Sequence, residues 1–178
     1  MPLVSLDRVA DLSDAERAEV RALGLAVYPP EAWADWPGRH IEWSTPEWCV
    51  RVRDGTGALA SYVGVYRRAA LCDERPVLVG GVGNVKTHPA ARRRGFARAG
   101  IGRAAEFLRG QGAAFVLLVC APHLIEYYSR LGWREFSGRL LVTQRGAATE
   151  FTLDRVMTHA LHADGPSTGV IDLSGPPW

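Results

Sequence analysis

The residues best suited to chemistry in this sequence form a basic segment in the middle of the chain. Arg92, Arg93 and Arg94 are followed by Gly95 and Ala97, and an amphipathic pattern typical of a helix continues from there. Backbone N–H groups in the first turn of a helix lack intrahelical partners and lie at its positive end. Glycine leaves the main chain open to close approach, and the arginines add charge. The segment therefore predicts a site for a phosphate or pyrophosphate.

Two common phosphate-binding loops do not match this segment. A P-loop requires Gly-Lys-Ser/Thr after its glycines, and no such tripeptide follows Gly95. A dinucleotide-binding turn requires Gly-x-Gly-x-x-Gly directly after a strand, whereas here a His-Pro turn and an arginine run intervene. The pair Gly100 and Gly102 lies a helical turn too late. The anion site therefore belongs to another class.

The spacing Arg92-x-x-Gly95-x-Ala97 resembles the coenzyme A pyrophosphate signature of the GNAT acyltransferase superfamily. A valine-rich strand precedes it, and residues 127–133 resemble a second superfamily feature, Tyr-x-x-x-Gly-Phe/Trp. The resemblance implies an α/β (α+β) GNAT fold. Its mixed, mostly antiparallel sheet would have about six or seven strands flanked by helices, with a splayed central strand pair.

Three glycines, Gly80, Gly81 and Gly83, fall inside the strand predicted at residues 77–86. Glycine inside a strand often marks close approach of another group to the backbone. In GNAT folds this strand splays from its neighbour, and acetyl-pantetheine binds strand backbone in the gap. The resemblance thus implies acetyl-CoA as cofactor, with these binding residues: Val85, Lys86, Thr87, Arg92, Arg93, Arg94, Gly95, Phe96, Ala97, Arg98 and Tyr128.

Length and composition indicate one ordinary globular domain over residues 1–178, with a Gly- and Pro-rich tail at residues 159–178. A net charge of +2 gives no support for a nucleic-acid partner, and CoA phosphates account for the arginine run. The three cysteines are widely spaced, so we expect no disulfide framework, no metal site and a cytoplasmic location. We see neither a signal peptide nor a membrane span.

Periodicity and turn signals predict the order of the elements along the chain. Ser13 and Glu16 form a capping box that starts a helix ending near Leu25. The other elements are strands at 2–9, 48–53, 58–68, 77–86 and 115–120, helices at 94–110 and 122–131, and two closing strands at 133–144 and 150–157. Residues 169–174 could add an edge strand.

A segment rich in tryptophan and acidic residues separates the first helix from the first hairpin. Prolines at positions 29, 30, 37 and 46 argue against one long regular element. One interpretation is a surface excursion pinned by its tryptophans, Trp33, Trp36, Trp43 and Trp48. The other, which we favour, is a pocket wall, because aromatic faces and carboxylates together suit a polar cationic ligand.

The whole chain resembles aminoglycoside 2′-N-acetyltransferases, through the early helix, the Trp-rich segment, the hairpin, Gly83-Asn84-Val85 and a tail ending in tryptophan. The nodulation N-acyltransferases share the layout and a similar tail over Thr168 to Asp172. Both groups modify the amine of an amino sugar. The resemblance implies these substrate-binding residues: Glu31, Asp35, Trp36, Glu42, Gly83, Asn84, Asp172 and Trp178.

The implied reaction is direct acetyl transfer from acetyl-CoA to a neutral primary amine. We expect the backbone N–H near Val85 to hold the oxyanion, and Tyr128 to be the general acid in preference to its neighbour Tyr127. Aminoglycoside 2′-N-acetyltransferases carry a glutamate where this chain has Gly83-Asn84, so the base is left open. One alternative is a water relay, and another is an amine that arrives partly deprotonated. The remaining alternatives are Glu31, Asp35, Glu42, Asp172 and the carboxylate of Trp178.

Three functions remain in view. The leading one is N-acetylation of an aminoglycoside-type antibiotic, conferring resistance, with kasugamycin as one candidate. The second is N-acylation of another amino sugar or a peptide amine. The third is a CoA-binding module without catalysis. We expect no nucleic-acid or membrane partner, and we favour a homodimer because dimers are common in the superfamily.

Overall fold

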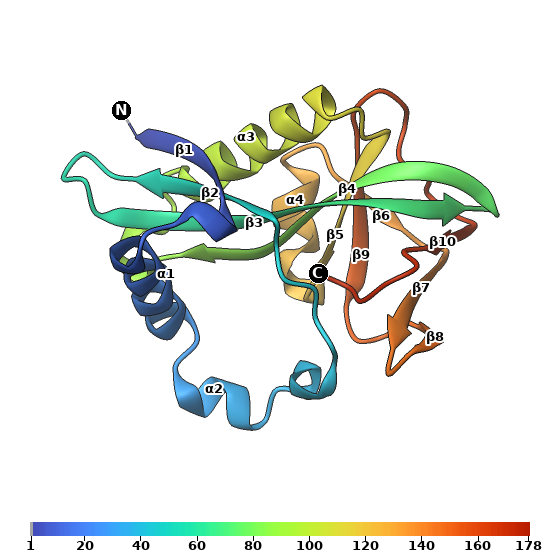
Figure 1. Cartoon of the computed structure of the whole chain (residues 1–178), viewed down its shortest axis with the longest axis horizontal. Helices are drawn as coiled ribbons and strands as arrows, with labels where there is room; N and C mark the ends of the chain where they lie inside the picture. The colour runs from blue at the N-terminus through green and yellow to red at the C-terminus, as the bar shows by residue number, and fades with distance from the viewer. Residues whose placement is uncertain (1) are drawn as a thin grey trace.

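The structure, a computed structural model, describes residues 2–178 and is built around one curled mixed sheet (Figure 1). The strands run in the order β6-β9-β5-β4-β3-β10-β7-β8. Strand β10 pairs with the end of β3, whereas β2 pairs with its first part, and β1 pairs with β2. Their bounds are β1 Leu3–Arg8, β2 Trp48–Arg53, β3 Leu59–Cys72, β4 Arg75–Thr87, β5 Phe115–Cys120, β6 Arg134–Phe136, β7 Arg139–Gln144, β8 Ala147–Glu150, β9 Arg155–Ala160 and β10 Val170–Asp172. The GNAT fold class predicted from the sequence is confirmed.

Helices cover both faces of the sheet. Figure 1 shows α3 above it, with α1 and the short α2 on the opposite side. The α-helices are α1 Asp14–Val27, α2 Pro30–Ala34, α3 Phe96–Gly110 and α4 Ile125–Ser129, with 3₁₀ turns η1 Val9–Asp11, η2 Pro37–His40, η3 Pro89–Ala91 and η4 Pro122–Leu124. Helices α3 and α4 share one core cluster, whereas α1 and the tail cover the other face. Across residues 2–178, no helix is long and apolar enough to span a membrane.

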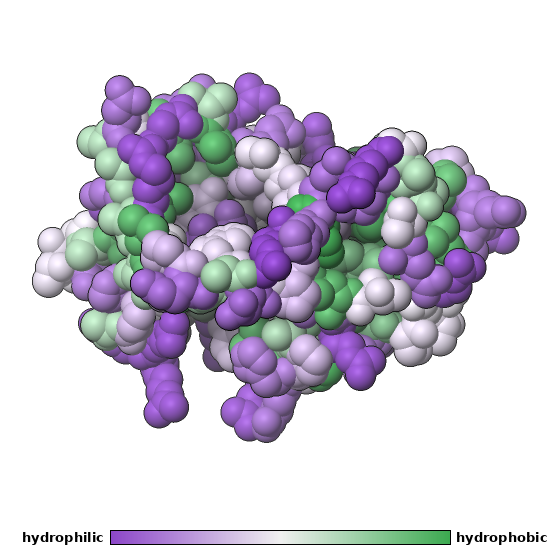
Figure 2. All heavy atoms as spheres, turned by 90° about the horizontal axis from the view of Figure 1, so that it is seen from below, coloured by the Kyte–Doolittle hydropathy of each residue, from purple (hydrophilic) through white to green (hydrophobic). Residues whose placement is uncertain are grey.

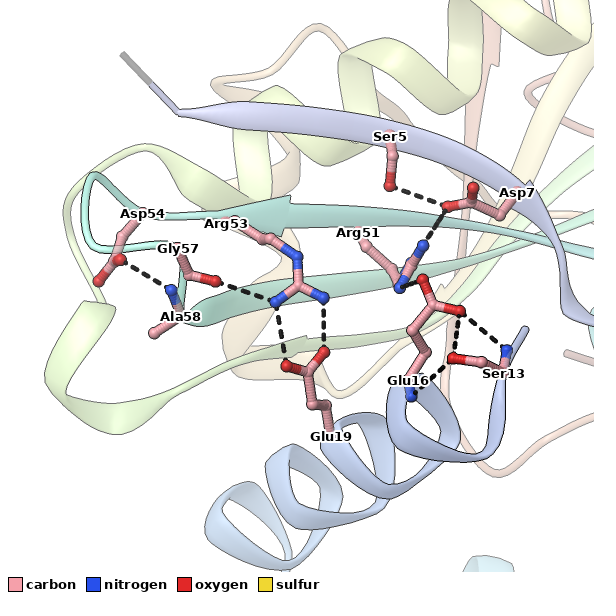
Figure 3. A network of polar contacts seen from close by, with 10 residues as sticks. All are labelled: Ser5, Asp7, Ser13, Glu16, Glu19, Arg51, Arg53, Asp54, Gly57 and Ala58. Carbon is pink, nitrogen blue, oxygen red and sulfur yellow. Dashed lines mark hydrogen bonds and ion pairs between the residues drawn. The ribbon is translucent and has the colours of Figure 1, made fainter.

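Helix α1 begins with a capping box, and a buried arginine holds the helix to the sheet (Figure 3). The hydroxyl of Ser13 accepts from the N–H of Glu16, and the Glu16 carboxylate accepts from the N–H of Ser13 at 2.8 Å. Arg51 on β2 lies 2.7 Å from Glu16 and 3.0 Å from Asp7 of β1. The arginine, with 6% of its surface exposed, thus ties three elements together.

The central pair β4 and β5 separates soon after it forms, which confirms the predicted splay. The two strands pair in parallel only from Val79↔Phe115 to Gly81↔Leu117. Beyond that point β4 continues along β3, and β5 continues along β9. The gap between their carboxyl ends opens toward the start of α3.

The sheet has ten strands, more than the six or seven predicted. The expected strand at 133–144 breaks between β6 and β7, because Ser137 N–H donates to Ser167 and Gly138 packs directly against Gly169. The expected strand at 150–157 also divides, since Glu150 ends the β7–β8 hairpin and β9 begins only at Arg155. Strand β10 is an interior strand, because it pairs with both β3 and β7.

Candidate active site

The basic loop before α3 has the geometry of an anion site. Gly95 is the N-cap of α3 with φ +82°, and Arg93 also has positive φ, +62°. A side chain added at Gly95 would meet no atom within 4 Å, so the backbone there is open to a ligand. His88 accepts from the N–H of Ala90 and thereby shapes the preceding turn. The first-turn N–H groups of α3 therefore face an accessible space.

The arginines of this loop are free to meet phosphate groups. Arg92, Arg93, Arg94 and Arg98 are all exposed. A shallow cleft of about 450 Å³ beside the helix start is lined by residues that include Gly95, Arg98 and Arg103. The loop thus combines open backbone donors with several exposed guanidinium groups, which fits the pyrophosphate of CoA.

A β-bulge interrupts β4 two residues before the strand ends. Tyr62 pairs with Lys86 and Gly64 pairs with Gly83, so Asn84 and Val85 together oppose the single residue Val63. Asn84 adopts φ +53° and is exposed. The extra residue of a bulge leaves the ladder locally unpaired. The predicted Val85 N–H donor therefore lies in a disrupted stretch of β4 beside the splay.

The two residues after the bulge differ in where their polar groups lie. The Lys86 ammonium lies 5.7 Å from the centre of the Tyr62 ring, on the face covered by α1, and burial lowers its pKa. The Thr87 hydroxyl lies 3.0 Å from that of Ser61, which also donates to the Lys86 carbonyl. These contacts fix the end of β4 against β3.

Tyr128 and Tyr127 occupy different environments on α4. Tyr128 is 6% exposed and packs its ring edge against Trp133, whereas Tyr127 is 37% exposed. Burial, assisted by nearby Cys120, raises the pKa of the Tyr128 phenol well above its usual range. Burial also raises the pKa of Tyr127, so both phenols are protonated at neutral pH and the two tyrosines are distinguished by their exposure. Tyr28, at the end of α1, also contributes to the raised pKa of Tyr128, and the sequence analysis did not single it out.

The last residue of the chain is docked against the splayed strands. Trp178 is 4% exposed, and its indole Nε1 donates to the carbonyl of Leu117 on β5 at 3.0 Å. Its ring stacks on Tyr66 with centroids 5.4 Å apart. Gly81 and Gly83 of β4 lie beneath it, and a side chain at Gly83 would come within 2.9 Å of the Trp178 carbonyl carbon. Trp178 and Gly83, both predicted to bind substrate, are thus neighbours.

The residues before Trp178 are tied to the Trp-rich segment. Ser44 N–H donates to the Pro177 carbonyl at 2.7 Å, and its hydroxyl donates to Pro176. The half-buried Arg68 of β3 donates to the Pro176 carbonyl and to the Ser44 hydroxyl, and lies over the Trp178 ring. We call this set of contacts the tail latch.

Residues 28–47 form an arch below the sheet (Figure 1). A continuous row of aromatic rings runs along it. Successive centroid distances of 5.0–6.2 Å join Tyr28, Trp33, Trp36, Trp43 and Phe151. Figure 2, viewed from the arch side, shows hydrophobic patches interrupted by projecting hydrophilic side chains. The arch therefore presents a mixed aromatic and polar surface.

The predicted acids of the arch and the tail do not gather at one point. Glu31 and Asp35 are exposed on or beside α2. The Glu42 carboxylate accepts from the N–H of Arg145 at 2.9 Å, which fixes the arch to the β7–β8 turn. Asp172 accepts from the N–H of Ser174 at 2.7 Å. These bonds give Glu42 and Asp172 structural contacts within the arch and the tail.

One partly buried acid that the sequence analysis missed lies near the carboxyl end of β5, on the side of β9. Asp154 precedes β9, whose Arg155 pairs with Cys120 at the carboxyl end of β5. Burial raises the pKa of Asp154, and nearby His123 opposes the shift. Asp154 also helps to raise the pKa of Cys120 to about 11, after the larger effect of burial. No local motif marks Asp154, because the pairing of β5 with β9 brings it here.

A splayed strand pair that leads through a bulge into an arginine-flanked helix start defines an acyl-CoA-binding fold. The profile described as "Acetyltransferase (GNAT) domain" matches residues 12–136, which is more than half of the chain. The protein therefore belongs to the GNAT acetyltransferase family. No curated protein sequence matches the chain.

Solved structures share this fold at low sequence identity. The GNAT family N-acetyltransferase YhbS from Escherichia coli, in complex with CoA, is 18% identical over 97% of this chain and 89% of its own (TM-score 0.63). A GNAT family acetyltransferase from Brucella melitensis in complex with acetyl-CoA is 16% identical over 95% and 94% (TM-score 0.58). The ribosomal-protein-S18-alanine N-acetyltransferase from Escherichia coli is 15% identical over 93% and 97% (TM-score 0.57). The predicted cofactor, acetyl-CoA, is confirmed at the level of the family.

Proposed function

We propose that this protein acetylates a primary amine of an aminoglycoside-type antibiotic at the 2′ position and thereby confers resistance, with kasugamycin as a candidate acceptor. The observation that carries the proposal is that the tail, bonded to the Trp-rich arch through Ser44, covers Gly81 and Gly83 of β4. This junction provides an acceptor wall next to the splay, as the resemblance to aminoglycoside 2′-N-acetyltransferases implies.

The chemistry of this wall supports a polar, cationic acceptor. Trp33 is 45% exposed, and Glu31 and Asp35 are exposed beside it on the same arch. Aromatic faces attract cations, and carboxylates pair with ammonium groups. An amino sugar offers both apolar ring faces for stacking and charged amines for pairing. Trp36 supports the arch by stacking on Trp43 with centroids 5.7 Å apart.

In the proposed reaction the neutral amine nitrogen forms a bond to the acetyl carbonyl carbon, and the carbon–sulfur bond breaks. The N–H of Val85 stabilises the negative charge that develops on the acetyl oxygen. Tyr128 gives its phenolic proton to the departing sulfur, and the proton lost by the amine restores the phenol through water. Acetyl-CoA supplies the activated acetyl group, and the first turn of α3 with Arg92 and Arg94 holds its pyrophosphate.

Asp154 is the carboxylate that we place nearest to the proton transfer. Its partial burial and its position beside Cys120 put it at the carboxyl end of β5, where the splay opens. A raised pKa brings a carboxylate closer to the value of an efficient base. We prefer Asp154 to Glu42, because the Glu42 carboxylate is already bonded to the N–H of Arg145.

The deciding experiment is a thiol-release assay with acetyl-CoA against a panel of aminoglycosides that includes kasugamycin, with a lysine peptide as comparison. We expect turnover on an amino sugar, and about 100-fold lower kcat for Asp154→Asn. Asp164→Asn, which alters an exposed aspartate of the tail, is the matched control and should retain activity. Turnover on the peptide alone would favour a peptide amine as acceptor. CoA binding without turnover would favour a non-catalytic module.

A further inference from the structure

Where β4 and β5 separate, the backbone carbonyl of Leu117 needs a hydrogen-bond donor. Leu117 is the last residue of β5 that pairs with β4, and it is fully buried. A buried carbonyl that loses its strand partner is costly unless another donor replaces it. The indole Nε1 of Trp178 supplies that donor at 3.0 Å. The tail thus completes a hydrogen bond at the vertex of the splay.

The indole is held in this place from several sides. Tyr66 stacks on it at an interplanar angle of 16°, and the Arg68 guanidinium lies 5.1 Å from its ring centroid. On the strand side, a Cβ added at Gly81 would overlap the indole ring. The two glycines that suggested close approach of a ligand, Gly81 and Gly83, therefore make room for Trp178.

We infer that the Trp178 indole is a wedge, a ring packed on one face of β4 at Gly81 and bonded to Leu117 of β5, which fixes how the two strands separate and so positions the strands that bind the pantetheine arm of CoA. The main chain of Trp178 lies against Gly83 on the same face, whereas a Cβ at Gly80 would point to α3 on the opposite face. A ring that contacts both strands sets their separation where pairing ends. Trp178 is accordingly a positioning residue for CoA binding, whichever amine accepts the acetyl group.

The test is calorimetric titration of CoA alone into the full-length protein. Trp178→Phe keeps an aromatic ring against Tyr66 and removes the N–H donor. We expect CoA binding to weaken about tenfold, since a buried carbonyl loses its partner and the strands rearrange. Trp43→Phe, which removes an indole N–H bonded to the Gly38 carbonyl within the arch, is the matched control and should bind CoA within about twofold of the wild type.

Adjacent glycines of β4 give a second, independent pair of variants. Gly81→Ala places a methyl group on the indole, whereas Gly80→Ala directs it at Leu108 of α3, on the opposite face, at 2.8 Å. We expect Gly81→Ala to weaken CoA binding like Trp178→Phe. Gly80→Ala should lower the melting temperature without a matching loss of CoA affinity.

A spectroscopic signal separates positioning from general stability. The ¹⁵N–¹H indole signal of Trp178 should shift when CoA is added, and that of Trp43 should not. Unchanged CoA affinity in Trp178→Phe would overturn the wedge. So would losses of CoA affinity in all four variants that are proportional to their losses in melting temperature. Because no acceptor is present, a wrong acceptor assignment does not affect the result. Failure of the wild type to bind CoA would overturn both the wedge and the CoA site.

Discussion

Two adjacent tyrosines show how burial can distinguish chemically identical residues. Tyr128 lies in the core shared by α3 and α4, beside Cys120, whereas Tyr127 projects to the surface. Burial disfavours the phenolate, so the Tyr128 proton is retained across the physiological range. The phenol belongs to the core cluster against which Val85 of β4 also packs, and we propose it as the acid that protonates the departing thiolate.

Tyr128→Phe removes only the hydroxyl and keeps the ring against Trp133. We expect kcat to fall about 100-fold, with little change in CoA affinity, because general acid catalysis contributes on this scale. The measurement is steady-state thiol release, paired with CoA titration. Tyr127→Phe serves as the control and should retain activity. Equal losses in both variants would contradict the assignment of the acid to Tyr128.

At the scale of elements, α1 depends on a charge network that joins it to two strands. Glu16 caps the helix start through Ser13 and also pairs with the buried Arg51 (Figure 3). Hydrogen bonds from Ser13, followed by Arg51, lower the pKa of Glu16 to about 2. One carboxylate therefore both caps α1 and holds it against β2.

The lowered pKa predicts how stability depends on pH. Because the folded state binds the Glu16 proton more weakly than the unfolded state, the stabilisation is present above an ordinary glutamate pKa of about 4.3 and is lost as pH falls toward about 2. Glu16→Gln should lower the melting temperature by a few degrees at pH 7, with a difference that shrinks below pH 4. Thermal denaturation across this range measures it.

The control for this prediction is Glu106→Gln on the exposed face of α3. Glu106 forms no ion pair among residues 2–178. Its replacement should leave the melting temperature unchanged at both ends of the pH range. A constant difference between Glu16→Gln and the wild type from pH 7 to pH 2 would argue against the ion-pair explanation.

At the scale of the whole molecule, the tail latch joins segments from the two ends of the chain. Ser44 of the arch and Thr143 of β7 donate backbone N–H groups to the tail carbonyls of Pro177 and Gly175, at 2.7 and 2.8 Å. Arg68 contacts the arch and the tail together. The acceptor wall and the wedge are therefore expected to move as one unit.

Arg68→Gln should loosen that unit, because it removes the guanidinium shared by Pro176 and Ser44. We expect the amides of Ser44 and Thr143 to exchange with deuterium about tenfold faster, as local opening becomes easier. Native-state hydrogen exchange measures this directly. Arg67→Gln is the matched control, since the Arg67 guanidinium donates to the side chain of Gln111 and lies over the Trp48 ring, on the other face. Equal exchange in both variants would show that Arg68 does not close the latch.

Local patterns in the sequence predicted much of the frame. The capping box at Ser13, the hairpin turn at 54–57 and the start of α3 at Gly95 each depend on residues only a few positions apart. Such short-range signals can be recognised in the sequence without knowledge of the fold. The splay was predicted through family resemblance, whereas the strand count was wrong because the close contact of Gly138 with Gly169 depends on the folded tail.

The surroundings of the site depended on contacts that no local pattern encodes. Asp154 reaches Cys120 only because β9 pairs with β5. Trp178 bonds to Leu117, 61 residues away, and lies against Gly81 and Gly83. The sequence analysis had interpreted these glycines as room for the cofactor. By itself the sequence determined the family and the order of most elements, and it marked the basic loop before α3, because those signals are local. Only the tertiary structure showed which tyrosine of the pair is buried and that Trp178 docks on β4 and β5, because burial and strand pairing join distant residues.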